Sequence, residues 1–405
     1  MRVIVVDEAL PVPVNSGKRI RTVELLRRLA KDHEILFVAP AEGLTPAADL
    51  AEMEGYGLTV RLVPRRPLVK RGWRFAWDLL RNVFLPAPYM VMGHRLRAVR
   101  AAVAEAAASW KPDLVHVEWT PLVANVPEGL GLPVVISAHN VESDIWARYR
   151  EAEQGFLRRA YVGLQHRKVL RFERRALGEA DAVTAVSEKD GERIRSWTGQ
   201  AHVTVAPNGV DAARFAPDPS VVVAPHEILF LGSLDWRPNQ DGVLWFLKHV
   251  FASIRARVPD ATLFVVGRAP PPWFVETVSR FEGARVAASV PDVRPFLARA
   301  AVTVVPLRVG GGSRLKICEA LAMERPVVST TVGAEGLDVR EGVVLADEPG
   351  AFADAVVATL ADPEGAARAA RVGRARVLAT HEWGTVAPLV ARAWADAVAR
   401  RRRAT

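Results

Sequence analysis

The feature that most constrains the fold is an alternation of short runs rich in valine and isoleucine with longer amphipathic segments, along most of the 405 residues. The short runs are apolar on both faces, which is typical of buried parallel strands. The segments between them, such as residues 17–32 and 94–110, have helical periodicity. The sequence therefore predicts strands at residues 3–7, 34–40, 113–118, 133–140, 182–188 and 203–209, and again at 228–234, 261–267, 284–289, 302–307, 326–331 and 342–347.

The alternation restarts after residues 211–227, which contain three prolines. This predicts an α/β protein of two doubly wound units, with a domain over 1–208, a second over 209–380 and a C-terminal helix over 381–405. Ligands of such sheets bind beyond the carboxyl ends of the strands, and two such edges facing one another would form a cleft. Candidate residues lie at the ends of the predicted strands: Asp7, Glu118, His139, Asn208, Gly209, Ser233 and residues 310–312.

Composition limits the class of protein. The single cysteine, Cys318, excludes an internal disulfide framework and a cysteine-based zinc site. No apolar run is long enough to cross a bilayer, and residues 1–11 are too short and too acidic for a secretory signal, so we expect a cytoplasmic protein, with the inner face of the membrane as an alternative location. The net charge of +9 favours anionic partners such as nucleotides, nucleic acid or a membrane surface, although an arginine-rich composition explains part of it.

The strongest motif is "VGGGSRLKICEALA" at residues 309–322. Three glycines lead into Ser313, Arg314 and Lys316 and then into a predicted helix. Backbone N–H groups at a helix start, together with two cations, suit a diphosphate. The spacing fits neither the Walker loop nor the dinucleotide motif. A phosphate-binding loop is the prediction, and a tight turn with a solvated basic pair is the alternative.

Each of the other candidate residues has a functional and a structural interpretation. Glu319 stands in an apolar helical segment and would accept a hydroxyl group such as that of ribose, or lie on the helix surface. His139 ends a strand and would donate to a sugar hydroxyl, or be structural. The segment 16–21, "SGKRIR", opens the first helix and would meet a substrate through Lys18, or simply cap the helix. Aspartate pairs are absent and histidines are scattered, so we predict no metal site.

In this order, the motifs "SGKRIRT", "SAHNVE", "APNGVDAARF", "FLGSLDWRPNQDGVLWF" and "VGGGSRLKICEALA" resemble glycosyltransferase family 4. The resemblance implies the GT-B fold, with two Rossmann-like domains facing across a cleft and a C-terminal helix that crosses back to the N-terminal domain. It also implies that the N-terminal domain binds the acceptor and the C-terminal domain binds the donor.

The resemblance implies a retaining, metal-independent hexosyltransferase that uses a UDP- or GDP-linked sugar as co-substrate and no other cofactor. The expected acceptor is a hydroxyl of a glycan, a lipid-linked compound or a small molecule in polysaccharide or glycoconjugate biosynthesis, and nucleic acid is not an expected partner. Two alternatives stay open. One is a GT-B sugar-nucleotide 2-epimerase, and the other is a non-catalytic nucleotide-sugar-binding protein.

The chain departs from the family pattern at two places. The family has two glutamates separated by seven residues; Glu319 matches the second, which holds the ribose, and Gly311 replaces the first. Ser233 and either Pro238 or Asn239 replace a family arginine and lysine, so Arg314 and Lys316 are expected to neutralise the diphosphate. The resemblance implies catalytic residues His139, Arg314 and Lys316; donor-binding residues Gly232, Ser233, Gly267, Gly311, Gly312, Ser313, Leu315 and Glu319; and acceptor-binding residues Ser16, Gly17, Lys18 and Asn140.

Residues 65–97 interleave arginine and lysine with tryptophan, phenylalanine and leucine, and Asp78 is their one acid. This composition suits peripheral contact with an anionic membrane, and the acceptor would then be lipid-linked. The alternative is an ordinary helix whose tryptophan and leucine face packs inward.

Overall fold

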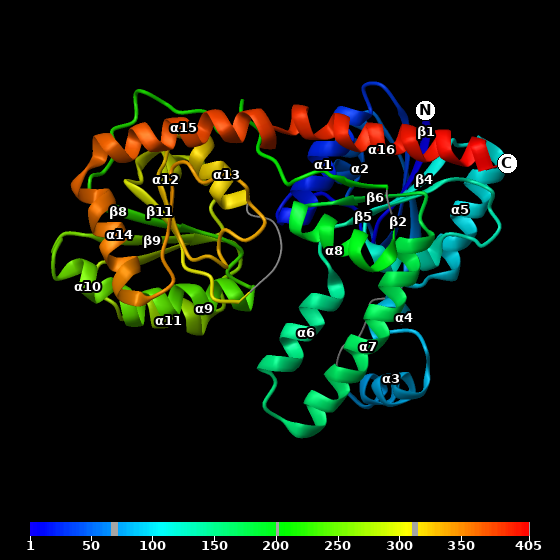
Figure 1. Cartoon of the computed structure of the whole chain (residues 1–405), viewed down its shortest axis with the longest axis horizontal. Coiled ribbons are helices and arrows are strands. Elements are labelled where there is room, and N and C mark those ends of the chain that lie inside the picture. The colour runs from blue at the N-terminus through cyan, green and yellow to red at the C-terminus, as the bar shows by residue number, and fades with distance from the viewer. Residues whose placement is uncertain (66–71, 200–201, 310–314, 405) are drawn as a thin grey trace. The chain divides into compact units, whose positions relative to one another are not determined.

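The chain folds into two α/β units (Figure 1), in a computed structural model that describes residues 1–65, 72–199, 202–309 and 315–404. The first unit comprises Met1–Pro207 together with the chain from Ala387 onward, and the second comprises Asn208–Val386. Each unit is one parallel sheet with helices around it. The expectation of two doubly wound units is confirmed.

The first unit contains a seven-stranded sheet in the order β3-β2-β1-β4-β5-β6-β7. Every neighbouring pair is parallel, and the central strands are buried on both faces, as their unbroken apolar sequences predict. The strands are β1 (Arg2–Val6), β2 (Glu34–Glu42), β3 (Leu58–Arg65), β4 (Leu114–Val117), β5 (Val134–Ala138), β6 (Ala182–Ala185) and β7 (Val203–Val205). The helices are α1 (Gly17–Leu29), α2 (Ala47–Gly55), α3 (Gly72–Phe84), α4 (Tyr89–His94), α5 (Arg97–Trp110), the 3-10 turn η1 (Thr120–Asn125), α6 (Glu142–Ala152), α7 (Phe156–Glu179) and α8 (Glu188–Thr198).

The second unit contains a six-stranded parallel sheet in the order β10-β9-β8-β11-β12-β13. Its strands are β8 (Glu227–Leu231), β9 (Thr262–Gly267), β10 (Ala284–Ala288), β11 (Val302–Val305), β12 (Val327–Ser329) and β13 (Val343–Leu345). Its helices are α9 (Arg237–Phe246), the π-helical turn η2 (Leu247–Phe251), α10 (Ala252–Arg255), α11 (Pro272–Ser279), α12 (Arg294–Arg299), α13 (Leu315–Ala322), α14 (Pro349–Ala361) and α15 (Pro363–His381).

The last helix, α16 (Trp383–Ala404), returns the chain to the first unit, as expected. Trp394 on this helix is fully buried, and its indole N–H donates to Nδ1 of His116 on β4 at 3.0 Å. Arg400 donates to the carbonyl of Asp181 at 2.6 Å, just before β6. These contacts tie the C-terminal helix to the same sheet that the N-terminus begins.

Helices α6 and α7 form a hairpin that extends away from the first sheet, with α3 beside α7 (Figure 1). Lys168 of α7 donates to the carbonyls of Asn82, Val83 and Leu85, at the carboxyl end of α3. A cation there satisfies carbonyls that the helix itself leaves unpaired. Gln165 adds a buried hydrogen bond of 2.6 Å to Asn82. Polar contacts therefore hold α3 against the hairpin.

All twelve predicted strands are confirmed, and one strand, β3, was missed. It forms the edge of the sheet, and its first five residues alternate apolar and polar side chains, so it lacks the unbroken apolar run of the other strands. The helix predicted over 94–110 is confirmed from Arg97 to Trp110, as α5, but it begins three residues later than predicted. Leu96 is extended and donates its backbone N–H to Oδ1 of Asn125 at 2.7 Å, which separates α4 from α5. No helix among the described residues is long and apolar enough to cross a membrane.

The second sheet depends on a close backbone approach at Gly267, the last residue of β9. The chain leaving β8 crosses directly over this residue, held by bonds from Gly232 N to Val266 O (3.1 Å) and from Leu234 N to Arg268 O (2.9 Å). A β-carbon at Gly267 would lie 1.8 Å from the carbonyl oxygen of Gly232. Backbone cannot yield as a side chain does, so only glycine fits here.

We predict that Gly267→Ala lowers stability by about 3 kcal/mol or more, because the new methyl group displaces the strand-end backbone. Thermal unfolding of the purified protein measures this change. Gly350→Ala is the matched control, since Gly350 has open space around its α-carbon and lies in a helix. Equal melting temperatures for the two variants would contradict the close approach.

Candidate functional site

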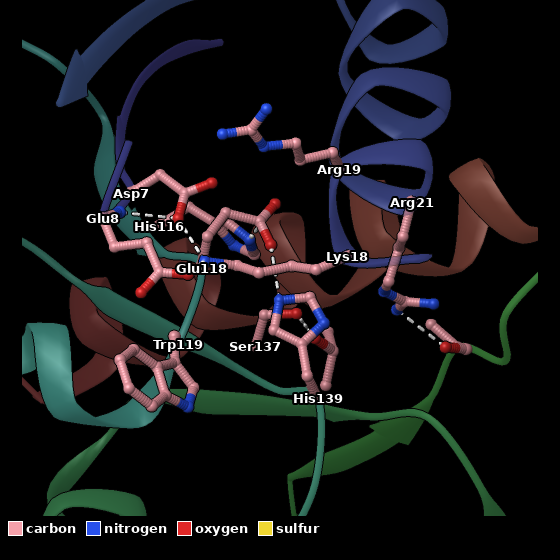
Figure 2. Close-up of polar contacts among 12 residues, drawn as sticks. Asp7, Glu8, Lys18, Arg19, Arg21, His116, Glu118, Trp119, Ser137 and His139 are labelled. Carbon is pink, nitrogen blue, oxygen red and sulfur yellow. Dashed lines mark hydrogen bonds and ion pairs between the residues drawn. The ribbon is translucent and has the colours of Figure 1, made fainter. Parts of the chain in front are cut away.

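The carboxyl end of the first sheet gathers a cluster of charged and imidazole side chains (Figure 2). Asp7 follows β1, Glu118 follows β4 and His139 follows β5, and these three strands are neighbours in the sheet. Parallel strands bring their carboxyl ends to one edge, so residues separated by more than a hundred positions meet. These candidates therefore lie at the strand ends, where the sequence predicted them.

Lys18 enters this cluster from the first turn of α1. Its ammonium group lies 2.6 Å from Oδ1 of Asp7 and 2.7 Å from Oε1 of Glu8. Burial raises the pKa of Asp7 to about 6 although Lys18 opposes the shift. Burial would lower the pKa of Lys18, but the two carboxylates outweigh it and raise that pKa above its usual value. Lys18 is therefore a charged residue whose charge two acids already balance.

Hydrogen bonding assigns the protons on two histidines. The indole of Trp394 can only donate, so Nδ1 of His116 accepts and its proton sits on Nε2. That nitrogen faces Oε1 of Glu118 at 3.4 Å, and Nε2 of His139 lies 3.0 Å from Oε2 of the same carboxylate. Burial alone would raise the pKa of Glu118, but its bonds to His116 and His139 hold that pKa well below its usual value. Glu118 is therefore an anion that accepts from both rings.

The same bonds fix the form of His139. Burial lowers its pKa although Glu118 opposes the shift, so the ring is neutral at neutral pH. Its one N–H points to Glu118, which leaves Nδ1 as an acceptor. Among the described residues Nδ1 has no hydrogen-bond partner. The expected donation from His139 to a sugar hydroxyl stays a prediction, and in this tautomer the ring nitrogen open to a ligand is the acceptor Nδ1.

The remaining candidates of the first unit have mixed outcomes. The hydroxyl of Ser16 accepts from the backbone N–H of Arg19 at 3.5 Å, so Ser16 caps the helix, and Gly17 begins α1. Asn140 is half-buried between β5 and α6, and among the described residues its side chain makes no hydrogen bond. Of the four acceptor candidates, Lys18 is the one inside the charged cluster.

A second buried acid pair lies at the start of α6. Glu173 of α7 accepts from the backbone N–H of Glu142 (2.8 Å) and of Ser143 (3.0 Å), and from the Ser143 hydroxyl (2.6 Å). Burial raises the pKa of Glu142 to about 7, although a bond from Trp119 Nε1 at 2.8 Å opposes the shift. No sequence motif points to Glu173, because its hydrogen bonds reach across the hairpin to α6.

The second unit brings Lys316 to the end of β8. Its ammonium group donates to Oδ1 of Asn239 at 3.0 Å and lies 4.6 Å from the ring centre of Phe230. Asn239 in turn donates to the carbonyl of Ser233 at 2.8 Å. A β-carbon at Gly232 would lie 3.1 Å from the Lys316 nitrogen, so the lysine lies against bare backbone. Asn239 is buried. The sequence pointed to it only as one of two residues that could replace a family lysine.

Glu319 lies one turn after Lys316 on α13 and is half-buried. Burial raises its pKa to about 7, while Lys316 and Arg214 oppose the shift. Among the described residues its carboxyl group makes no hydrogen bond, so it is available as an acceptor. Leu315 is buried in the core beneath the helix. Gly311, Gly312, Ser313 and Arg314 lie outside the described residues, as does most of the glycine loop.

We predict that Glu142→Gln stabilises the protein at pH 8.5 but has little effect at pH 5. An acid whose pKa rises on folding favours the folded state while it is protonated, and this contribution is lost as pH rises from about 4.5 through about 7. Glutamine mimics the protonated form and keeps the acceptor for Trp119. The expected gain at high pH is about 2 kcal/mol, measured by thermal unfolding.

Glu151→Gln is the control for this experiment, because Glu151 is an exposed acid on the same helix. A gain for Glu142→Gln that is equal at both pH values would show that burial does not perturb this carboxyl group.

Comparison with known proteins shows which family this chain resembles. Residues 16–214 match the family model "Glycosyltransferase Family 4", and residues 225–362 match "Glycosyl transferases group 1". A glycogen synthase of Mycobacterium tuberculosis is 27% identical over 327 residues, covering 75% of this chain and 74% of that protein. A GDP-mannose-dependent alpha-(1-6)-phosphatidylinositol monomannoside mannosyltransferase of Mycolicibacterium smegmatis is 31% identical over 241 residues, covering 52% of this chain and 61% of that protein.

Solved structures share the fold over the whole length. Sucrose-phosphate synthase from Thermosynechococcus elongatus matches with a TM-score of 0.71 at 17% identity, covering 99% of this chain and 100% of that one. Anabaena HepE in complex with UDP and glucose matches with a TM-score of 0.68 at 15% identity, covering 97% and 98%. The fold is GT-B, and the chain belongs to glycosyltransferase family 4 as a retaining enzyme that uses a nucleotide sugar.

Proposed function

We propose that the second unit binds the nucleotide sugar and that the first unit binds the acceptor. The observation that carries the donor assignment is Lys316, whose ammonium group lies against the backbone of Gly232 with the half-buried Glu319 one turn away. A cation over bare backbone suits a diphosphate, and a carboxyl group beside it suits ribose hydroxyls. The family assignment favours transfer over the epimerase and binding-protein alternatives.

Cleavage of the sugar–phosphate bond moves negative charge onto the diphosphate. Lys316, and Arg314 in the loop before it, would stabilise that charge more in the transition state than in the bound substrate. The leaving phosphate oxygen takes the proton of the acceptor hydroxyl on the same face of the sugar, so that the configuration is retained. His139 contributes as a neutral acceptor of a sugar hydroxyl through Nδ1, because Glu118 occupies its N–H.

The donor is a UDP- or GDP-linked hexose in this proposal. The relatives support both nucleotides, since one is named GDP-mannose-dependent and HepE was crystallised with UDP and glucose. A panel of UDP- and GDP-hexoses, assayed for nucleoside diphosphate release with and without glycan acceptors, tests the function. Release from none of these donors would overturn it.

We predict that Lys316→Met weakens binding of the nucleoside diphosphate at least tenfold, as loss of a charged hydrogen bond to phosphate implies. Calorimetry with the diphosphate found active in the panel measures the affinity. Lys248→Met is the control, because Lys248 is an exposed lysine of the same unit on η2. Unchanged affinity in Lys316→Met would place the diphosphate elsewhere.

We further propose that α3 contacts an anionic membrane and that the acceptor is lipid-linked, in polysaccharide or glycoconjugate biosynthesis at the inner face of the membrane. Trp73, Trp77, Leu80 and Phe84 are 75%, 59%, 53% and 82% exposed. Their spacing of four, three and four residues puts them on one face of the helix. We call these four residues the α3 stripe.

The exposure of the α3 stripe supports the membrane interpretation of residues 65–97. The alternative is a helix whose tryptophan and leucine face packs inward, and the exposure of Trp73, Trp77 and Leu80 counts against it. Phe75 and Leu79 are half-buried, and Arg81 is exposed beside the stripe. Arg65 pairs with Glu42 at 3.6 Å, so it belongs to the fold. Residues 66–71, with three further basic residues, lie outside the described chain.

We predict that Trp77→Ala combined with Phe84→Ala lowers binding to vesicles of phosphatidylglycerol and phosphatidylcholine at least tenfold. Removing two large apolar side chains from the bilayer interface loses several kcal/mol, about 1.5–3 for each. Co-sedimentation measures the bound fraction. Trp273→Ala, which truncates a half-exposed tryptophan of the second unit, is the control. If wild-type protein ignores the vesicles at low salt, the acceptor is a soluble compound.

A further inference from the structure

The α6–α7 hairpin contains a pocket of about 320 Å³. The α7 residues at its wall, Phe156, Ala160, Gly163 and Arg167, recur every three or four positions and so share one face of the helix. Arg159 and Leu164 flank that face, and Arg150 reaches over from the last turn of α6. The pocket therefore lies between α6 and one face of α7.

Gly163 makes room for this arrangement. It is buried, and a β-carbon there would lie 3.5 Å from both Cδ and Nε of Arg150. The Arg150 side chain therefore lies across α7 at the glycine. Together with Arg159 and Arg167 of α7, it gives the pocket three exposed arginines from two helices.

These three charges lack a counter-ion in the described chain. No carboxylate lines the pocket, and among the described residues none of the three arginines makes an ion pair or a hydrogen bond. Other arginines nearby are paired, for example Arg175 with Glu179 at 2.9 Å and Arg193 with Asp144 at 3.3 Å. Three exposed arginines around one pocket that no carboxylate lines make its surface electropositive, and this favours an anionic ligand.

We propose that this pocket binds the phosphate group of a lipid headgroup. The planar guanidinium group of arginine presents donors that match phosphate oxygens. Three arginines provide more donors than a single carboxylate can accept, so a phosphate fits better. The apolar wall of Phe156, Ala160 and Leu164 would pack against the glycerol and the first carbons of an acyl chain. The volume lies at the lower end of the range for small-molecule sites, which fits a headgroup.

The test uses a short-chain phospholipid as a monomer, so that no bilayer is involved. Wild-type protein should bind dihexanoyl phosphatidylglycerol, below its micelle concentration, more tightly than inorganic phosphate in calorimetry. Arg159→Gln combined with Arg167→Gln should weaken that binding at least tenfold. Arg158→Gln combined with Arg171→Gln removes the same charge from exposed positions of α7 outside the pocket, and should bind as wild type does.

Each other outcome overturns the proposal. Equal loss in the two double variants would show a general charge effect and no site. Equal affinity for inorganic phosphate would show an anion site without a lipid preference. No binding by the wild type would exclude the pocket altogether. Because the pocket involves neither the α3 stripe nor the sugar-transfer residues, these failures are distinguishable from failure of the vesicle experiment and of the donor panel.

Discussion

The first unit depends on the Glu118 carboxylate, which is held between two imidazole rings at the centre of the sheet edge. A carboxylate that is only 2% exposed is costly unless hydrogen bonds satisfy it. His116 and His139 supply those bonds, and Trp394 of the last helix fixes which nitrogen of His116 carries the proton. Packing of the C-terminal helix and orientation of His139 are therefore parts of one network.

Lys18 of the first unit and Lys316 of the second have different neighbours. Lys18 lies between two carboxylates and is fixed as part of a balanced cluster. Lys316 donates to the neutral amide of Asn239 and lies against the backbone of Gly232, beside a carboxyl group whose pKa burial raises to about 7. The second environment suits an anionic ligand better than the first, which agrees with a donor diphosphate in the second unit.

Two surface features lie on the helices that extend from the first sheet, on α3 and on the α6–α7 hairpin. The α3 stripe leaves four large apolar side chains exposed, and the hairpin pocket gathers three arginines without carboxylate partners among the described residues. Burying the stripe inward would have stabilised the fold, so its exposure suggests use in binding. Both features suit an acceptor that is presented at a lipid surface.

The sequence by itself determined the fold class and most of the strands, because parallel strands buried on both faces leave unbroken apolar runs. It also placed Asp7, Glu118 and His139 directly after such runs, and Ser233 two residues after one. The edge strand β3 escaped detection because its sequence contains no unbroken apolar run. The glycine-rich motif at residues 309–322 pointed to Lys316 and the family resemblance to the role of Glu319, whereas periodicity alone pointed to neither.

Only the tertiary structure decided how these residues are paired. Glu173 caps a helix 31 residues before it, and Trp394 bonds His116 across 278 positions, separations that no local pattern records. The bond from His139 to Glu118, across 21 positions, directs the ring N–H to that carboxylate and leaves Nδ1 as the open acceptor. The C-terminal end of α3 is likewise held by Lys168 and Gln165 on another helix, more than 80 positions away. Side-chain periodicity defines an apolar face, but a packing partner decides whether that face is buried.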